Sequence, residues 1–309
     1  MEYGAAIWGP MCGANRLRKL EVLQEQFGRR LLRLHDNAAG EYVRCELGLE
    51  SVKERLSLAV LRFYGRLAAM PDSRLAGFVF RQRCAQVDRD EAGLSWCWHA
   101  REKLQEAGQS AVWRERAVPE NWKSEAKAAV RVLFQQKSEE LMRSMTTLEL
   151  VRRLGPVSTP GWLDRAVRHP GAALRLKLRS GGAPIMQMVG ARDGTPPDQR
   201  TCRICGTGAV ETAEHFAAEC PAYAAERAEC LRRIDALLGE PCQLLPEALQ
   251  EGDVALFLGD KWLQRLPPQL AQQADATVCN FLKLAWKARE PIWQDFCCEG
   301  DEWKLKEES

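Results

Sequence analysis

Residues 201–220 read TCRICGTGAVETAEHFAAEC, and the rest of the chain is organised around this stretch. Two residues separate Cys202 from Cys205, nine separate Cys205 from His215, and four separate His215 from Cys220. Two thiolates on a tight loop, with an imidazole and a thiolate at the start of a helix, can close a tetrahedron around Zn²⁺. The spacing therefore predicts a zinc site whose ligands are Cys202, Cys205, His215 and Cys220.

The residues around these four favour a helix that begins just before His215. Thr212 is a candidate N-cap, and Pro221 fits a break or a new helix start. The alternative is three core cysteines and a hydrogen-bonded histidine, but four ligand-type residues within this short stretch argue against it. Four protein ligands leave no open coordination position, so we expect a structural zinc ion and not a catalytic one.

Charge is unevenly distributed along the chain, although the net charge of its 309 residues is only +2. Residues 151–203 carry ten basic and three acidic side chains, whereas residues 204–309 carry ten basic and 19 acidic ones. A polyanion would bind the first block and be repelled by the second. The candidate phosphate contacts are Arg175, Lys177, Arg179, Arg192, Arg200 and Arg203.

Composition excludes several classes of protein. The hydrophobic fraction of 46% indicates a globular chain. The apolar runs are far shorter than the ~20 residues that span a bilayer, so we expect no membrane partner, and the N-terminal residues have no secretory signal pattern. Of the twelve cysteines, only three have metal-ligand spacing, which favours a reducing compartment, the nucleus or the cytoplasm.

Apolar periodicity predicts a mostly α-helical chain. In residues 15–36 the apolar side chains recur at steps of three and four and form one expected buried stripe, made of Leu20, Leu23, Phe27, Leu31 and Leu34. Ser51 and Glu54 form a capping box that begins the next long helix. The alternation in residues 174–179 suits a strand, but Ala172 and Ala173 before it favour a helix, which we expect.

Aromatic and histidine residues outside the zinc stretch have structural interpretations. Trp113 and Trp122 lie on helical patterns, where core packing is favoured over the stacking of nucleobases. His169 has no ligand-type neighbour at a useful spacing, so we expect a structural role.

Four segments of the chain together resemble one known family. They are residues 3–8 (YGAAIW), residues 20–34 with 45–70, residues 176–181 (LKLRSG) and the zinc stretch with its continuation to Arg227. The zinc segment is the most specific, and its likeness includes Glu211, Thr212, Pro221 and Tyr223. The chain is similar to the C-terminal portion of the reverse transcriptase of non-LTR (LINE-type) retrotransposons.

This resemblance implies four regions. They are thumb-like helices in residues 1–92, a helical connector in 93–150, a basic segment with a CCHC zinc module in 151–240, and a helical region in 241–309. The polymerase palm of the family, with its Asp-Asp motif, has no counterpart, because the sequence contains no adjacent aspartate pair. The resemblance places Met1 close to the end of the family's palm, which suggests a truncated or domesticated reading frame.

The sequence also lacks a GxxxxGK[ST] loop and a GxSxG elbow. We therefore expect a non-catalytic fragment that binds RNA or DNA, with a structural zinc knuckle. One alternative is a helical protein-interaction module whose zinc site is purely structural. Another is an enzyme fragment that works only with a palm domain supplied separately.

Overall fold

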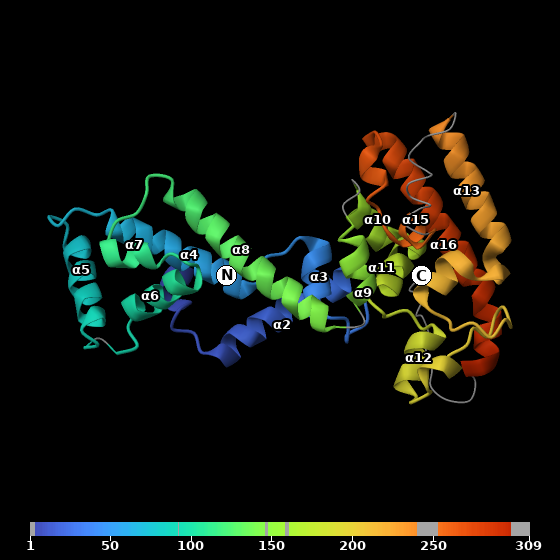
Figure 1. The fold of residues 1–309 in the computed structure, drawn as a ribbon, viewed down its shortest axis with the longest axis horizontal. Coiled ribbons are helices and arrows are strands. Elements are labelled where there is room, and N and C mark those ends of the chain that lie inside the picture. Colours follow the sequence, from blue (N-terminus) through green and yellow to red (C-terminus); the bar gives the residue numbers. More distant parts are fainter. Residues whose placement is uncertain (1–3, 92, 146–147, 158–160, 240–252, 298–309) are drawn as a thin grey trace. The chain divides into compact units, whose positions relative to one another are not determined.

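The computed structural model describes residues 4–91, 93–145, 148–157, 161–239 and 253–297 (Figure 1). These residues form helices, turns and loops, and they contain no β-strand; one isolated antiparallel bridge joins Thr201 to Val210. The expectation of a mostly α-helical chain with a CCHC cluster is confirmed. Part of the expected 241–309 region, residues 241–252 and 298–309, lies outside the described residues.

The chain divides into two compact units, residues 1–26 with 47–144 and residues 27–46 with 145–309. Helices on both sides of the expected boundary at residue 92 share one core, and so do helices on both sides of residue 240. The first unit contains α1 (Ala5–Trp8), part of α2 (Ala14–Leu31), α4 (Val52–Ala68), α5 (Leu75–Asp88), α6 (Trp96–Glu106), α7 (Ser110–Glu115) and α8 (Trp122–Ser144).

The core of the first unit lies between α4, α5, α6, α7 and α8. Ser51 caps α4, since its Oγ accepts from the amide of Glu54 at 3.0 Å, as the capping box predicts. Trp122 is buried and donates its indole N–H to the carbonyl of Leu61 at 2.8 Å. Gly65 permits this close approach, because a Cβ there would lie 2.1 Å from the indole ring. Trp113 is also buried, so the core interpretation of both tryptophans is confirmed.

Helix α2 presents a different face from the one that its sequence predicts. Leu23 and Phe27 are 57% and 67% exposed, whereas Glu21 and Glu25 are buried. The physical reason lies at the start of α4, where Glu21 accepts from the amide of Lys53 at 3.1 Å. Amide groups at a helix N-terminus attract a carboxylate. The prediction that Leu23 and Phe27 belong to a buried apolar stripe is therefore wrong.

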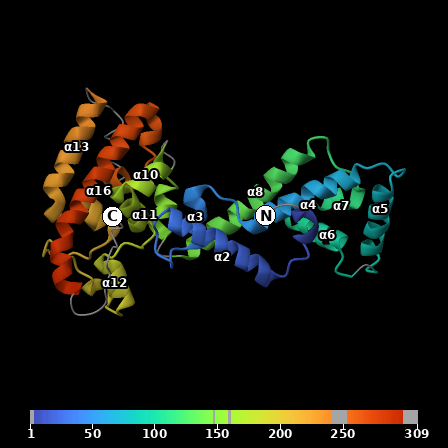
Figure 2. The ribbon, with the colours of Figure 1, turned by 180° about the vertical axis from the view of Figure 1, so that it is seen from behind.

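The second unit contains α3 (Gly40–Leu47), α9 (Glu149–Leu154), α10 (Trp162–Arg168), α11 (Pro170–Arg179), α12 (Met186–Arg192) and η2 (Pro197–Gln199). It continues with η3 (His215–Glu219), η4 (Pro221–Tyr223), α13 (Ala224–Leu238), α15 (Asp253–Leu258), η5 (Leu263–Arg265) and α16 (Pro268–Cys297). Helices α13 and α16 run side by side in both views (Figures 1 and 2).

Helix α11 packs closely against α16, and the expected helix over residues 174–179 is confirmed. A Cβ at Gly171 would lie 1.8 Å from the carbonyl oxygen of Cys279, so only glycine fits there. His169 caps α11, because its Nδ1 accepts from the amide of Gly171 at 3.2 Å while its Nε2 lies 3.1 Å from Asn280 Oδ1. These contacts confirm its structural role.

Candidate metal centre

Cys202 and Cys205 lie on a hairpin-like loop that the backbone closes tightly. The amide of Cys202 donates to the carbonyl of Ala209 at 2.7 Å, and the amide of Glu211 donates to the carbonyl of Arg200 at 2.9 Å. Gly206 sits inside this loop at φ +64°, a left-handed conformation that glycine adopts at little cost. The loop therefore turns sharply after Cys205 and returns toward η3.

His215 and Cys220 lie at the two ends of a π-helical turn. The amide of Cys220 donates to the carbonyl of His215 at 2.7 Å, and Thr212 Oγ1 accepts from the amide of His215 at 2.9 Å, as the predicted N-cap. In an α-helix, positions five apart point about 140° away from each other. The wider π-turn, common at functional sites, brings the two side chains to one side.

The four predicted ligands meet at one point, and their ligand atoms all lie within 4.8 Å of one another. Cys202 Sγ is 4.0 Å from Cys220 Sγ, and Cys205 Sγ is 3.5 Å from His215 Nε2. A tetrahedral zinc ion with ordinary bond lengths requires edges of about 3.8 Å between sulfurs and about 3.5 Å between sulfur and nitrogen. These two separations are close to the edges of such a tetrahedron.

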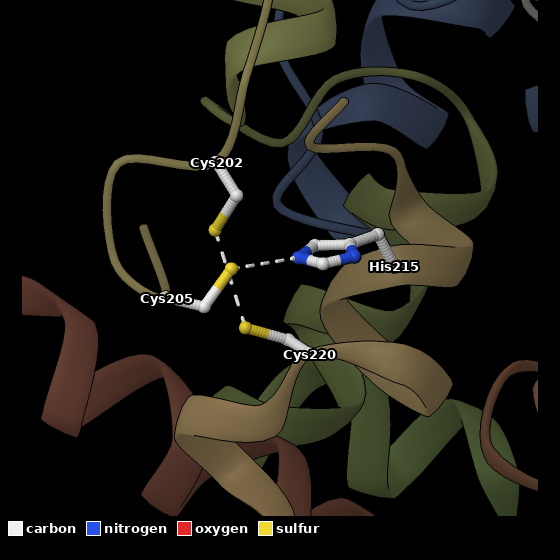
Figure 3. A group of neighbouring side chains, drawn as sticks. All are labelled: Cys202, Cys205, His215 and Cys220. Carbon is white, nitrogen blue, oxygen red and sulfur yellow. Dashed lines mark hydrogen bonds between the residues drawn. The ribbon is translucent and has the colours of Figure 1, made fainter. Parts of the chain in front are cut away.

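Figure 3 shows the three sulfurs and the imidazole converging from the loop and from η3. Cys202, His215 and Cys220 are buried, and Cys205 is half-buried. The other ring nitrogen of the histidine, Nδ1, lies 3.8 Å from the carboxylate of Glu219, and Nε2 lies toward the sulfurs.

The electrostatics of the cluster favour a thiolate. A hydrogen bond from the Cys220 thiol, together with the amides of Cys205 and Ile204, outweighs the effect of burial and lowers the pKa of Cys202 to about 4. The same contact raises the pKa of Cys220. Two adjacent thiolates repel each other, and a cation between them removes that conflict. Because all four positions are protein ligands, the arrangement supports a structural metal and offers no site for a substrate.

Sequence reasoning missed the buried pair that supports this centre. Glu211 accepts from the amide of Met186 at 2.6 Å and pairs with Arg289 of α16 at 2.9 Å. Both side chains of the ion pair are 1% exposed. The resemblance includes Glu211, but no local pattern connects it with an arginine 78 residues later.

Two of the six predicted phosphate contacts are buried and cannot reach a polyanion. Arg175 pairs with Asp275 at 2.6 Å, and Arg179 pairs with Glu46 at 2.9 Å. Their exposed fractions are 2% and 0%. The prediction for these two is corrected: they neutralise buried carboxylates, and helix α11 directs them into the core of the second unit.

The other four predicted contacts lie nearer the surface. Lys177 is half-buried, and desolvation, with the charge of Arg33, lowers its pKa. Arg200 is half-buried and donates to the carbonyl of Thr195 at 2.8 Å. Arg192 and Arg203 are exposed. The structure therefore does not bring the six predicted phosphate contacts together on one face.

The comparisons with known proteins give no family for the chain. No protein family description, no curated protein and no solved structure matches it. In the described residues, no helix is both long enough and apolar enough to cross a bilayer. No disulfide joins any of the nine cysteines whose side chains the structure describes.

Proposed function

We propose that the chain binds RNA or DNA without catalysing a reaction, and that a structural Zn²⁺ at Cys202, Cys205, His215 and Cys220 holds its binding surface in shape. The observation that carries this proposal is the convergence of these four ligand atoms within 4.8 Å. Three sulfurs and one imidazole are typical of zinc and disfavour magnesium or calcium, which prefer oxygen ligands.

The position of Arg203 supports the nucleic-acid part of the proposal. This residue lies between two metal-ligand cysteines in sequence, and it is exposed on the loop. A loop held by a metal ion loses little conformational entropy when the guanidinium of Arg203 binds a phosphate, and this favours affinity for the nucleic acid. The surrounding basic block supplies the long-range attraction that a polyanion needs.

The zinc assignment is tested by measuring the metal content of the purified chain. We expect one zinc ion per chain in the wild type, and substoichiometric zinc in Cys205→Ser. The control is Cys12→Ser, which removes a half-buried thiol from the first unit and leaves the four ligands intact. Equal zinc in both variants would contradict the ligand assignment.

The binding proposal is tested by titrating labelled single-stranded RNA and DNA at several salt concentrations. Each phosphate contact contributes about 0.7 to the slope of log affinity against log salt for single strands. We expect Arg203→Gln to reduce the slope by about this amount. The control, Arg232→Gln on α13, removes an exposed cation that pairs with Glu229. An affinity that does not change with salt would reject the proposal.

A second candidate function is a protein-interaction module, and helix α5 favours it. Leu75, Phe78 and Val79 are 77%, 51% and 46% exposed near the start of this helix, while its opposite face is buried in the core of the first unit. Contiguous exposed apolar side chains often mark a protein-binding surface. If this is the function, Phe78→Ser abolishes partner capture and leaves nucleic-acid affinity unchanged.

A further inference from the structure

The four side chains of the candidate metal centre are not equally protected from solvent. Cys202, His215 and Cys220 are 3%, 3% and 0% exposed, whereas Cys205 is half-buried. Cys205 Sγ also lies 3.1 Å from the hydroxyl of Thr207, a residue that is itself exposed. Among the four, the sulfur of Cys205 is therefore the ligand atom nearest the solvent.

The loop beyond Cys205 leaves this sulfur accessible. Residues 206–209 are all exposed. Gly206 and Gly208 have open space around them, because a Cβ at either position would meet no atom within 4 Å. A small solute can therefore reach Cys205 from the tip of the loop, whereas it would have to open the core of the second unit to reach the two buried cysteines.

A second sulfur lies within reach of Cys205 on the same loop. Cys202 is three positions earlier, and the two sulfurs are among the ligand atoms that lie within 4.8 Å of one another (Figure 3). A disulfide bond requires about 2.05 Å between its sulfurs, so one sulfur has to move by less than about 3 Å. The turn at Gly206 is open to solvent, so Cys205 can make this movement without displacing packed side chains.

Cys220 is held in place from both sides of its backbone. Its amide donates to the carbonyl of His215 at 2.7 Å, and its carbonyl accepts from Arg227 Nη2 at 3.0 Å. It also follows the π-turn and is fully buried in the core of the second unit. The partner that Cys205 can approach most easily is therefore Cys202 and not Cys220.

We infer that Cys205 is an oxidation site, and that hydrogen peroxide converts Cys202 and Cys205 to a disulfide. The thiolate of Cys205 attacks one oxygen of the peroxide, so that a sulfur–oxygen bond forms, the oxygen–oxygen bond breaks and hydroxide leaves. The thiolate of Cys202 then attacks the sulfur of this sulfenic acid, which forms the disulfide and releases a second hydroxide. The two sulfurs together lose two electrons, and one peroxide molecule gains them.

The disulfide removes two of the four ligands from the metal centre. His215 and Cys220 alone cannot close a tetrahedron, so the oxidised chain is expected to release its zinc. A dithiol reductant reverses the oxidation by thiol–disulfide exchange and restores both thiolates. The zinc part of this inference rests on the proposed function, whereas the oxidation of the two cysteines does not.

The order of attack is tested on the full zinc-loaded chain with a limiting amount of iodoacetamide, followed by peptide mass spectrometry of the chains that carry one alkyl group. We expect the label on Cys205 ahead of Cys202 and Cys220. Cys230 is the internal reference, because it is 3% exposed and is not a predicted ligand. A first label on Cys202 or Cys220, or equal labelling of all three ligand cysteines, would overturn the inference.

The oxidation is followed with graded hydrogen peroxide, by zinc release to a coloured chelator and by peptide mass spectrometry without reduction. We expect each chain to lose its zinc as the Cys202–Cys205 disulfide forms, and to regain it after dithiothreitol and added Zn²⁺. The control, Cys12→Ser, should behave like the wild type, because it lacks only a half-buried thiol of the first unit. A disulfide that contains Cys220 would overturn the inference.

The zinc measurement also separates this inference from the proposed function. If the purified chain holds zinc and keeps it after peroxide treatment, the inference fails and the proposed function stands. If the purified chain holds no zinc, the proposed function loses its metal. In that case a Cys202–Cys205 disulfide formed by peroxide in the metal-free chain still supports the oxidation site, and its absence overturns it.

Discussion

Arg289 and Glu211 form a two-point ion pair inside the second unit. Arg289 Nε donates to Glu211 Oε1 at 3.0 Å, and Nη2 donates to Oε2 at 2.9 Å. The same guanidinium lies over the ring of Trp286, 5.0 Å from its centroid. Because Glu211 follows the cysteine loop and Arg289 belongs to α16, this pair joins the metal centre to the longest helix of the unit.

Removing one partner of this pair is expected to destabilise the second unit strongly. Arg289→Met leaves the Glu211 carboxylate buried without its cation, which costs about 3 to 5 kcal/mol. Urea unfolding measures this change in the free energy of unfolding. The control, Arg232→Met, removes an exposed partner of Glu229 and is expected to leave the free energy of unfolding nearly unchanged. Similar small effects in both variants would show that the pair is not buried as described.

Gly65→Ala is expected to disrupt the contact between α4 and α8. The new Cβ would lie 2.1 Å from the Trp122 ring, so the helices must separate, at a cost of about 1 to 3 kcal/mol or more. Gly13→Ala is the matched control, because a Cβ at Gly13 meets nothing within 4 Å. Thermal unfolding distinguishes the two. Zinc content should stay at the wild-type value in both variants, since neither glycine lies in the second unit.

The two faces of α5 are expected to respond differently to truncation. Phe80 is 4% exposed and packs on Tyr64 with ring centroids 5.3 Å apart, so Phe80→Ala should cost about 3 to 5 kcal/mol. Phe78 is 51% exposed, and Phe78→Ala should cost less than about 1 kcal/mol. Denaturant midpoints for the two variants test this. A large loss from Phe78→Ala would mean that this side chain is buried in solution.

Removal of the metal is expected to loosen the cysteine loop and leave the first unit intact. Structural zinc contributes about 10 to 16 kcal/mol to the folding of small zinc modules. After chelation, the amides of Cys202 and Glu211 should lose protection from hydrogen exchange, because their acceptors lie across the loop. The amides of α4 and α8 serve as the control. Unchanged protection at Cys202 would show that the loop folds without a metal.

Spacing along the chain was sufficient to predict that four ligand-type side chains meet at one point. The positions of Cys202, Cys205, His215 and Cys220 allow few other arrangements, because the loop and the following turn are short. The π-turn between His215 and Cys220 was not predictable, since regular helix geometry would place these side chains about 140° apart. Metal-ligand spacing therefore indicated the site more reliably than helix periodicity did.

Periodicity and local charge were less reliable for burial. The arginines of α11 looked like surface cations, yet Arg175 and Arg179 meet Asp275 and Glu46, which lie 100 and 133 residues away in sequence. In α2, the carboxylate of Glu21 lies at the start of α4, and this contact overrides the apolar pattern. Long-range ion pairs leave no signal in a single sequence, so hydrophobicity alone assigned the wrong faces.

X-ray absorption at the zinc edge of the purified chain is the sharpest test of the proposed metal centre. We expect a first shell of three sulfurs at about 2.3 Å and one nitrogen at about 2.0 Å. In Cys205→Ser the zinc that remains should show fewer sulfurs, and in Cys12→Ser the shell should be unchanged. A shell of oxygen and nitrogen alone, or a chain that binds no zinc at all, would rule out zinc coordination by these four side chains.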